Sequence, residues 1–154
     1  MGYPLGFAPD AQGRGTTPEG VQRIIGAEYG SQGRISGCQI GLRGDMQYTI
    51  AAGAAVVRTG TGLAVKVPVE AVTVPTIAAP ATGMRRDYVV VGVDGQVSVK
   101  QAKPSAGAVI GEVNVPARIV ATTGASVLAD ARYARQIGTP LGPLVGRWTD
   151  PAAK

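Results

Sequence analysis

Hydrophobic residues recur at every second position in much of this chain, in short runs separated by glycine, proline and aspartate. This alternation predicts β-strands with one buried face. Eight or so such runs, punctuated roughly every eight to twelve residues, are typical of an antiparallel β-sandwich or a small barrel. The runs are expected at residues 35–42, 46–52, 54–59, 63–67, 69–74, 87–93, 96–101, 108–115 and 119–122.

Turn residues indicate how some of these strands connect. Gly60-Thr61-Gly62 closes one predicted hairpin, and Asp94-Gly95 is the strongest hairpin motif in the chain. Pro68 interrupts an alternating run, which suggests an edge strand or the start of a strand. Cys38 lies inside the first predicted strand, where it is expected to be a small buried hydrophobic residue.

Helical spacing occurs near both ends of this β region. Thr17-Pro18-Glu19 provides an N-cap, a proline at the first helical position and an acid in the first turn, and apolar residues then recur at helical spacing. This predicts a short helix over 17–30. A possible short C-terminal helix is expected over 126–137, with Ser126 or Thr123 as its N-cap.

These patterns divide the chain into four parts. An extended N-terminal arm is expected over 1–16, the short helix over 17–30 and the β-sandwich core over 34–122. Residues 123–154 are expected to form a helix and an extended C-terminal docking tail. The expected fold is therefore mainly β, with short helices and extended terminal arms.

The terminal segments carry large apolar residues among many glycines and prolines. They suit arms that lie along a neighbouring subunit, whereas the alternatives are a disordered N-terminus and a C-terminal strap over the chain's own domain. The candidate interface residues are Tyr3, Leu5, Phe7, Leu141, Leu144 and Trp148.

The amino-acid composition excludes several kinds of catalytic and metal-binding site. The 154 residues include no His and one Cys, which excludes Ser-His-Asp and Cys-His nucleophiles, mixed Cys/His zinc sites and an intrachain disulfide. Val and Ile greatly outnumber Leu and Met, which favours sheet over helix. Charged residues make up only 16%, against about 25% in an average soluble domain, and this suggests a surface covered by other subunits.

No catalytic, cofactor-binding or metal-binding residues are expected. The candidate acids are expected at turns or element ends, where aspartate has a structural reason to be, and they are Asp45, Asp87, Asp94, Glu112 and Asp130. The net charge of +5 is scattered along the chain, so nucleic-acid binding is not expected. The first residues do not form a signal peptide, and no apolar run is long enough for a transmembrane helix, so no membrane partner is expected.

Several short motifs follow one another in a characteristic order. They are Ser36-Gly37, Gly44-Asp45-Met46 with Tyr48-Thr49-Ile50, Ala52-Gly53, Val56-Val57, Arg85 or Arg86 with Asp87-Tyr88-Val89-Val90, and Asp130-Ala131-Arg132. In this order they resemble the N-terminal virion-attachment domain of tail proteins from phages that infect actinobacteria. The resemblance covers roughly residues 34–135, and its weight lies in the order of the motifs.

The resemblance implies a non-enzymatic structural protein of a siphophage virion, most simply a minor tail protein at the tail tip or baseplate. Expected partners are further copies in a trimer or hexameric ring, other tail proteins and, as a possibility, a host surface glycan. The protein would be made in the bacterial host cytoplasm and reside in the virion. Alternatives are a capsid decoration or head-fibre base protein and a carbohydrate- or receptor-binding module. Arg86 and Asp87 are expected to form an ion pair at the start of the core strand.

Overall fold

The computed structural model describes residues 8, 10–12, 15–128 and 132–137 of the chain. Within them one α-helix precedes ten β-strands, and the strands form three antiparallel sheets that do not close into a barrel. The prediction of a mainly β protein with a short N-terminal helix is confirmed, and the arrangement is consistent with a β-sandwich.

The elements have the following bounds: α1 (Pro18–Glu28), β1 (Gly33–Gly37), β2 (Ile40–Leu42), β3 (Gln47–Ile50), β4 (Gly53–Gly60), β5 (Leu63–Val69), β6 (Val72–Pro75), β7 (Met84–Val91), β8 (Val97–Lys100), β9 (Ala108–Pro116), the 3-10 turn η1 (Thr122–Gly124) and β10 (Ser126–Val127). The sheet orders are β1-β4-β5, β2-β3-β6 and β10-β9-β7-β8.

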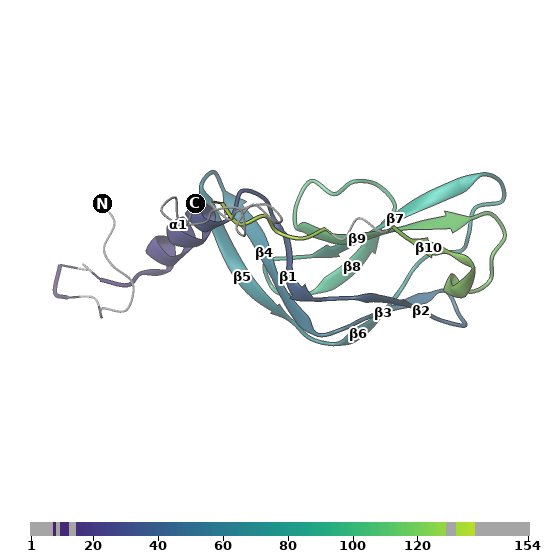
Figure 1. Cartoon of the computed structure of the whole chain (residues 1–154), viewed down its shortest axis with the longest axis horizontal. Helices are drawn as coiled ribbons and strands as arrows, with labels where there is room; N and C mark the ends of the chain where they lie inside the picture. The colour runs from purple at the N-terminus through teal and green to yellow at the C-terminus, as the bar shows by residue number, and fades with distance from the viewer. Residues whose placement is uncertain (1–7, 9, 13–14, 129–131, 138–154) are drawn as a thin grey trace, which may run out of the picture.

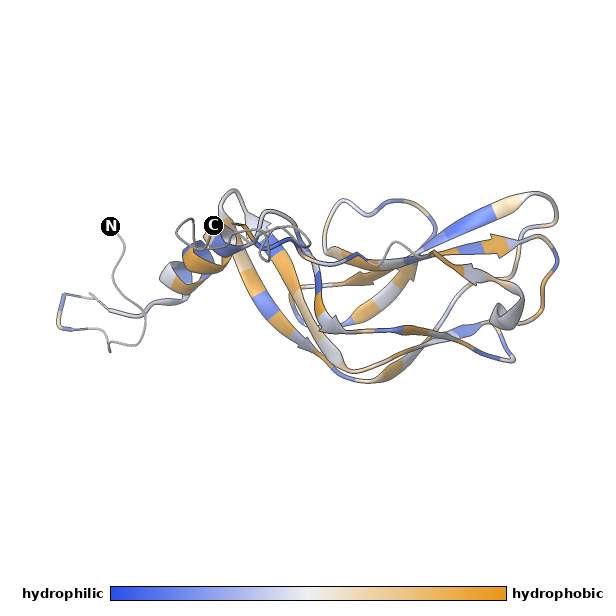
Figure 2. Cartoon of the chain, viewed as in Figure 1, coloured by the Kyte–Doolittle hydropathy of each residue, from blue (hydrophilic) through white to orange (hydrophobic). Residues whose placement is uncertain are grey.

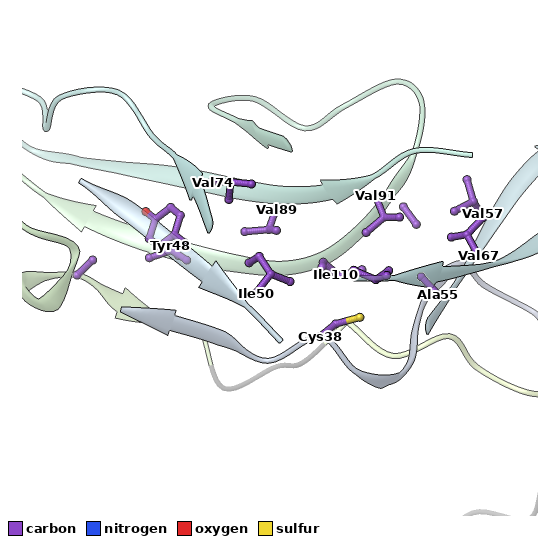
Figure 3. Packing of buried hydrophobic residues seen from close by; sticks show 14 of the residues in the cluster. Cys38, Tyr48, Ile50, Ala55, Val57, Val67, Val74, Val89, Val91 and Ile110 are labelled. Carbon is purple, nitrogen blue, oxygen red and sulfur yellow. The ribbon is translucent and has the colours of Figure 1, made fainter. Parts of the chain in front are cut away.

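The molecule is elongated, with α1 at one end (Figure 1). The β2-β3-β6 sheet faces the four-stranded sheet to form the sandwich, and the β1-β4-β5 sheet continues it toward α1 (Figure 1). The space between these layers is filled by small branched side chains and one aromatic ring, that of Tyr48 (Figure 3). The core is therefore built mainly from the β-branched residues that are abundant in the sequence and favour sheets.

Local capping explains why α1 forms where it does. The Thr17 hydroxyl oxygen accepts a hydrogen bond from the Gly20 amide at 3.0 Å, and Pro18 occupies the first turn. Ile25 is the buried side chain of the helix. A Cβ on Gly26 would lie 2.3 Å from the Gly62 carbonyl oxygen, so glycine lets the helix rest directly on the β4–β5 turn. The helix predicted over 17–30 is confirmed with slightly shorter bounds.

A sharp corner replaces the single strand predicted over 35–42. The chain leaves β1 at Gly37, turns at Cys38, whose φ is +59°, and enters β2 in a different sheet. A Cβ on Gly37 would lie 2.2 Å from the Ala52 carbonyl oxygen, and one on Gly53 would lie 2.2 Å from that of Ser36. The backbone segments that contain Gly37 and Gly53 pass each other here, and only glycine permits such a close approach. We call this site the glycine corner.

Both predicted hairpin turns are present. Residues 61–62 join β4 to β5, and the turn between β7 and β8 contains Asp94-Gly95, with Gly95 at φ +80°. Pro68 lies within β5, which is an edge strand, so its missing N–H breaks no ladder.

Two predictions for the C-terminal third are wrong. Residues 119–122 form no regular strand, and the described part of 126–137 is extended, not helical. The segment 126–137 is extended because its backbone finds hydrogen-bond partners on other elements. β10 pairs with β9, and residues 132–137 pair with β1 and with the end of α1. We call residues 132–137 the strap. Its ladder includes Arg34 N–H to Arg132 O at 2.7 Å and Ile137 N–H to Glu28 O at 2.6 Å.

Candidate functional site

The β7–β9 register places the two buried carboxylates of the described residues on opposite faces of one sheet. Asp87 is opposite Val113, whereas Glu112 is opposite Tyr88. Directly opposed residues point to the same face, and neighbours along a strand point to opposite faces. Asp87 therefore faces the core between the layers, and Glu112 faces outward.

Asp87 is the centre of a polar network inside the core. Its carboxylate accepts hydrogen bonds from the Tyr48 hydroxyl at 2.7 Å, from the Thr76 hydroxyl at 2.5 Å and from Arg85 Nε at 2.8 Å. Burial, and then the hydrogen bond to Asp87, raise the pKa of the Tyr48 phenol far above its usual value. Every buried side-chain donor and acceptor here has a partner.

The partner of Asp87 differs from the one predicted. Asp87 pairs with Arg85, and Arg86 pairs instead with Glu112 at 3.3 Å. Consecutive residues of a strand point to opposite faces, so Arg86 cannot share a face with Asp87, whereas Arg85, two residues away, can. Arg85 also donates to the Ile77 and Ala78 carbonyls, at 3.1 and 2.5 Å. This pair thus ties the loop of residues 76–83 to the sheet.

Glu112 fixes the strap to the outer face. Arg132 donates to it from Nε at 2.5 Å and from Nη2. Beside it, the buried Arg34 donates to the Ile110 carbonyl at 2.9 Å, and its guanidinium lies 5.3 Å from the centre of the Tyr133 ring. Sequence reasoning missed this arrangement, because it assigned residues 126–137 to a helix.

These positions limit what the buried groups do chemically. Two carboxylates on opposite faces of a sheet cannot flank one substrate, and both are bound by arginines. The described residues contain no group of three His, Cys, Asp or Glu side chains that could hold a metal ion. Cys38 is fully buried, and burial raises the pKa of its thiol, although the charge of Arg34 acts in the opposite direction. No helix within the described residues combines the length and the hydropathy that crossing a bilayer requires.

A groove of about 760 Å³ lies between the β4–β5 hairpin, β8 and residues 105–107. Its wall combines Arg58, Lys100 and Asp94 with small apolar and uncharged polar residues, and no aromatic ring lines it. Sugar rings commonly stack on aromatic side chains, so this groove lacks the platform expected of a carbohydrate site.

Of the eight large apolar side chains that are exposed among the described residues, six lie at the two ends of the molecule, and the other two are Val72 in β6 and Val93 in the β7–β8 turn. At the α1 end, formed by α1 and the strap, they are Ile24, Tyr133 and Ile137. At the opposite end, which we call the distal end and which is formed by residues 76–84 and 117–121, they are Ile77, Met84 and Val120. Figure 2 shows hydrophobic colouring on α1 and on the loop that follows β9.

The apolar residues predicted to form an interface are not the ones that the structure exposes at these two ends. Tyr3, Leu5, Phe7, Leu141, Leu144 and Trp148 all lie outside the described residues. The distal end was not anticipated, because its apolar residues occur singly in segments that read as loops and strand ends. No periodic pattern marks such residues as a surface.

Comparison with known proteins returned no relative: no family model, no curated protein and no solved structure matches the chain.

Proposed function

We propose that this protein is a non-enzymatic structural subunit of a phage virion, a minor tail protein that assembles with copies of itself and with other tail proteins. The observation that carries the proposal is the distribution of exposed apolar side chains, three at each end of an elongated domain. Surfaces of this kind suit contacts with neighbouring proteins. The arm predicted over 1–16 and the docking tail predicted within 123–154 would extend these contacts.

The buried charges support the same interpretation. Asp87 holds the loop of residues 76–83 in place, and Glu112 holds the strap, so both carboxylates stabilise the ends of the domain. Their acceptor positions are used within the fold. A scaffold needs such rigid ends because flexible ones would lose entropy on assembly.

The motifs behind the resemblance also have structural roles. Ser36-Gly37 and Ala52-Gly53 meet at the glycine corner, and Arg85 with Asp87 forms the core ion pair. Arg132, from the last motif, binds Glu112. The motifs that carry the resemblance to virion-attachment domains therefore contain residues on which this fold depends. This agreement supports the proposal for the domain as a whole.

Labelling of virions tests this function. Antibodies raised against the purified chain would be applied with gold particles to phage produced from the genome that encodes it. We expect label at the tail tip or baseplate, abolished when the antibody is first mixed with purified protein. Label over the head would favour the capsid decoration or head-fibre alternative. Absence of the chain from purified particles, checked by mass spectrometry, would contradict a virion role.

A further inference from the structure

We propose that the groove between the β4–β5 hairpin, β8 and residues 105–107 binds an extended acidic peptide segment of another protein, whose carboxylates pair with Arg58 and Lys100. The inference goes beyond the proposed function, because the groove shares no residue with the apolar ends or the strap. It rests on that function only for the kind of partner, which is another protein of the same particle.

The groove carries positive charge that the fold does not neutralise. Arg58 and Lys100 are exposed and line it from two different sheets, the first from β4 and the second from β8. Among the described residues neither side chain forms an ion pair, whereas six other arginines and lysines do. Arg58 only donates from Nη2 to the Tyr29 carbonyl, at 3.4 Å. The groove therefore attracts anions.

A single carboxylate, that of Asp94, gives the groove a direction. Asp94 lies in the β7–β8 turn, where its Oδ1 accepts a hydrogen bond from the Gln96 N–H at 3.0 Å. Lys100 lies at the opposite end of β8, roughly 13 Å along the strand from Gln96 at about 3.3 Å per residue. Acidic side chains of a ligand are therefore favoured at the Lys100 end and repelled at the turn.

The two walls of the groove are held in place within the free chain. Gln32, between α1 and β1, accepts a hydrogen bond at Oε1 from the Arg58 N–H at 3.0 Å and donates from Nε2 to the Gly107 carbonyl at 3.1 Å. Gly107 has a φ of +86°, and a Cβ there would lie 2.7 Å from Val90 Cγ1, so glycine lets this loop rest closely on β7. A preformed groove loses little conformational entropy when a ligand binds.

The lining of the groove suits a peptide better than other anions. Its volume of about 760 Å³ is within the usual range of ligand sites, and small residues such as Gly92, Ser98 and Ala106 let a peptide backbone approach closely. Its lining residues include no aromatic ring on which a nucleobase or a sugar could stack. None of them belongs to a helix, whose N-terminal amides commonly hold phosphate groups.

The terminal segments of this chain do not have the required composition. Their charged side chains are Asp10 and Arg14 in residues 1–16, and Arg147, Asp150 and Lys154 in residues 138–154. Each segment thus carries one acid and at least one base. An acidic segment must therefore come from a different protein.

Fluorescence anisotropy with the full chain tests the site. The probe is a labelled synthetic peptide in which glutamate alternates with serine, and the control probe has lysine in place of glutamate. The acidic probe should bind, more weakly as salt concentration rises, and the lysine probe should not. The double variant Arg58→Gln with Lys100→Gln should bind the acidic probe about tenfold more weakly.

Two further variants separate the groove from the general attraction of a basic protein. Arg23→Gln with Lys66→Gln removes the same amount of charge outside the groove and should bind like the wild type. Asp94→Asn keeps the oxygen that accepts from Gln96 but removes the one carboxylate of the groove, so it should bind the acidic probe about two- to fivefold more tightly. Misfolding does not produce such a gain, and thermal unfolding checks the other variants.

Four results would overturn the inference. They are a wild-type chain that does not bind the acidic probe, a folded groove variant that binds like the wild type, weaker binding by Asp94→Asn, and displacement of the probe by inorganic phosphate more readily than by unlabelled acidic peptide at equal ionic strength. The virion labelling experiment does not depend on these outcomes. A chain found in the tail that fails the binding test would keep its proposed function and lose only this site.

Discussion

Replacing Tyr48 by phenylalanine removes one hydroxyl group from the core while the ring stays in place. The hydroxyl is fully buried and donates to the Asp87 carboxylate at 2.7 Å. A hydrogen bond to a charged group contributes about 1.5–3 kcal/mol. Asp87 keeps Thr76 and Arg85 as partners, so no carboxylate is left unpaired, and the expected loss is about 2 kcal/mol.

Urea denaturation followed by circular dichroism measures this loss. For a domain of this size it corresponds to a fall in Tm of about 4–8 °C. Tyr88→Phe is the matched control, because Tyr88 follows Asp87 and points to the half-buried outer face. Its free energy of unfolding should stay within about 0.5 kcal/mol of the wild type.

A double-mutant cycle with Asp87→Ala decides whether the hydroxyl acts through the carboxylate. Asp87→Ala alone should cost about 3–5 kcal/mol, since it leaves the largely buried Arg85 without its partner. In that background Tyr48→Phe should cost much less, giving a coupling energy of at least about 1 kcal/mol. Additive losses, or a loss below about 0.5 kcal/mol for Tyr48→Phe, would refute the reasoning.

Three further predictions follow from the same structure. The raised pKa of the Tyr48 phenol keeps it protonated in the folded chain while the unfolded chain ionises near pH 10, so stability should fall as pH rises above about 10, and Tyr48→Phe should lessen that fall in pH-dependent urea denaturation. Cys38, the single cysteine, should react with a thiol reagent such as DTNB only as fast as the core opens; immediate reaction in the native protein would contradict its burial. Gly53→Ala should lower the free energy of unfolding by more than about 3 kcal/mol because its Cβ meets backbone, whereas Gly44→Ala, with open space around it, should change it by less than about 0.5 kcal/mol in the same urea assay.

Local patterns predicted the parts of the fold that depend on neighbouring residues. Thr17 and Pro18 mark the start of α1, and Asp94-Gly95 marks the β7–β8 turn, because caps and tight turns are set by the residues that form them. The residues around Cys38 were assigned to one strand because alternation continues through them. The strand ends there because the segment around Gly53 passes close to Ser36 and Cys38, and a local sequence pattern does not show such a tertiary contact.

The candidate site was less predictable for the same reason. Alternation along β7 separates Arg86 from Asp87, and the predicted pair neglected this alternation although the sequence contains it. Glu112 and Arg132 meet only because the strap crosses the outer face of the sheet. Small residues such as Ala134 are compatible with a helix, but the strap is extended because its backbone hydrogen-bonds to β1 and to the end of α1.

The strap also bears on when the domain can finish folding during synthesis. The Glu28 carbonyl at the end of α1 accepts its hydrogen bond from the Ile137 amide, so residues more than a hundred positions apart complete the same turn. Synthesis proceeds from the N-terminus, and contacts of such wide sequence separation form late. The helix made first on the ribosome thus receives its last partner only after nearly all of the sheet residues have emerged. Until then, α1 can pack on β5 of the same chain, but the Glu28 carbonyl and the Gly30 amide at its end lack the partners that the strap supplies.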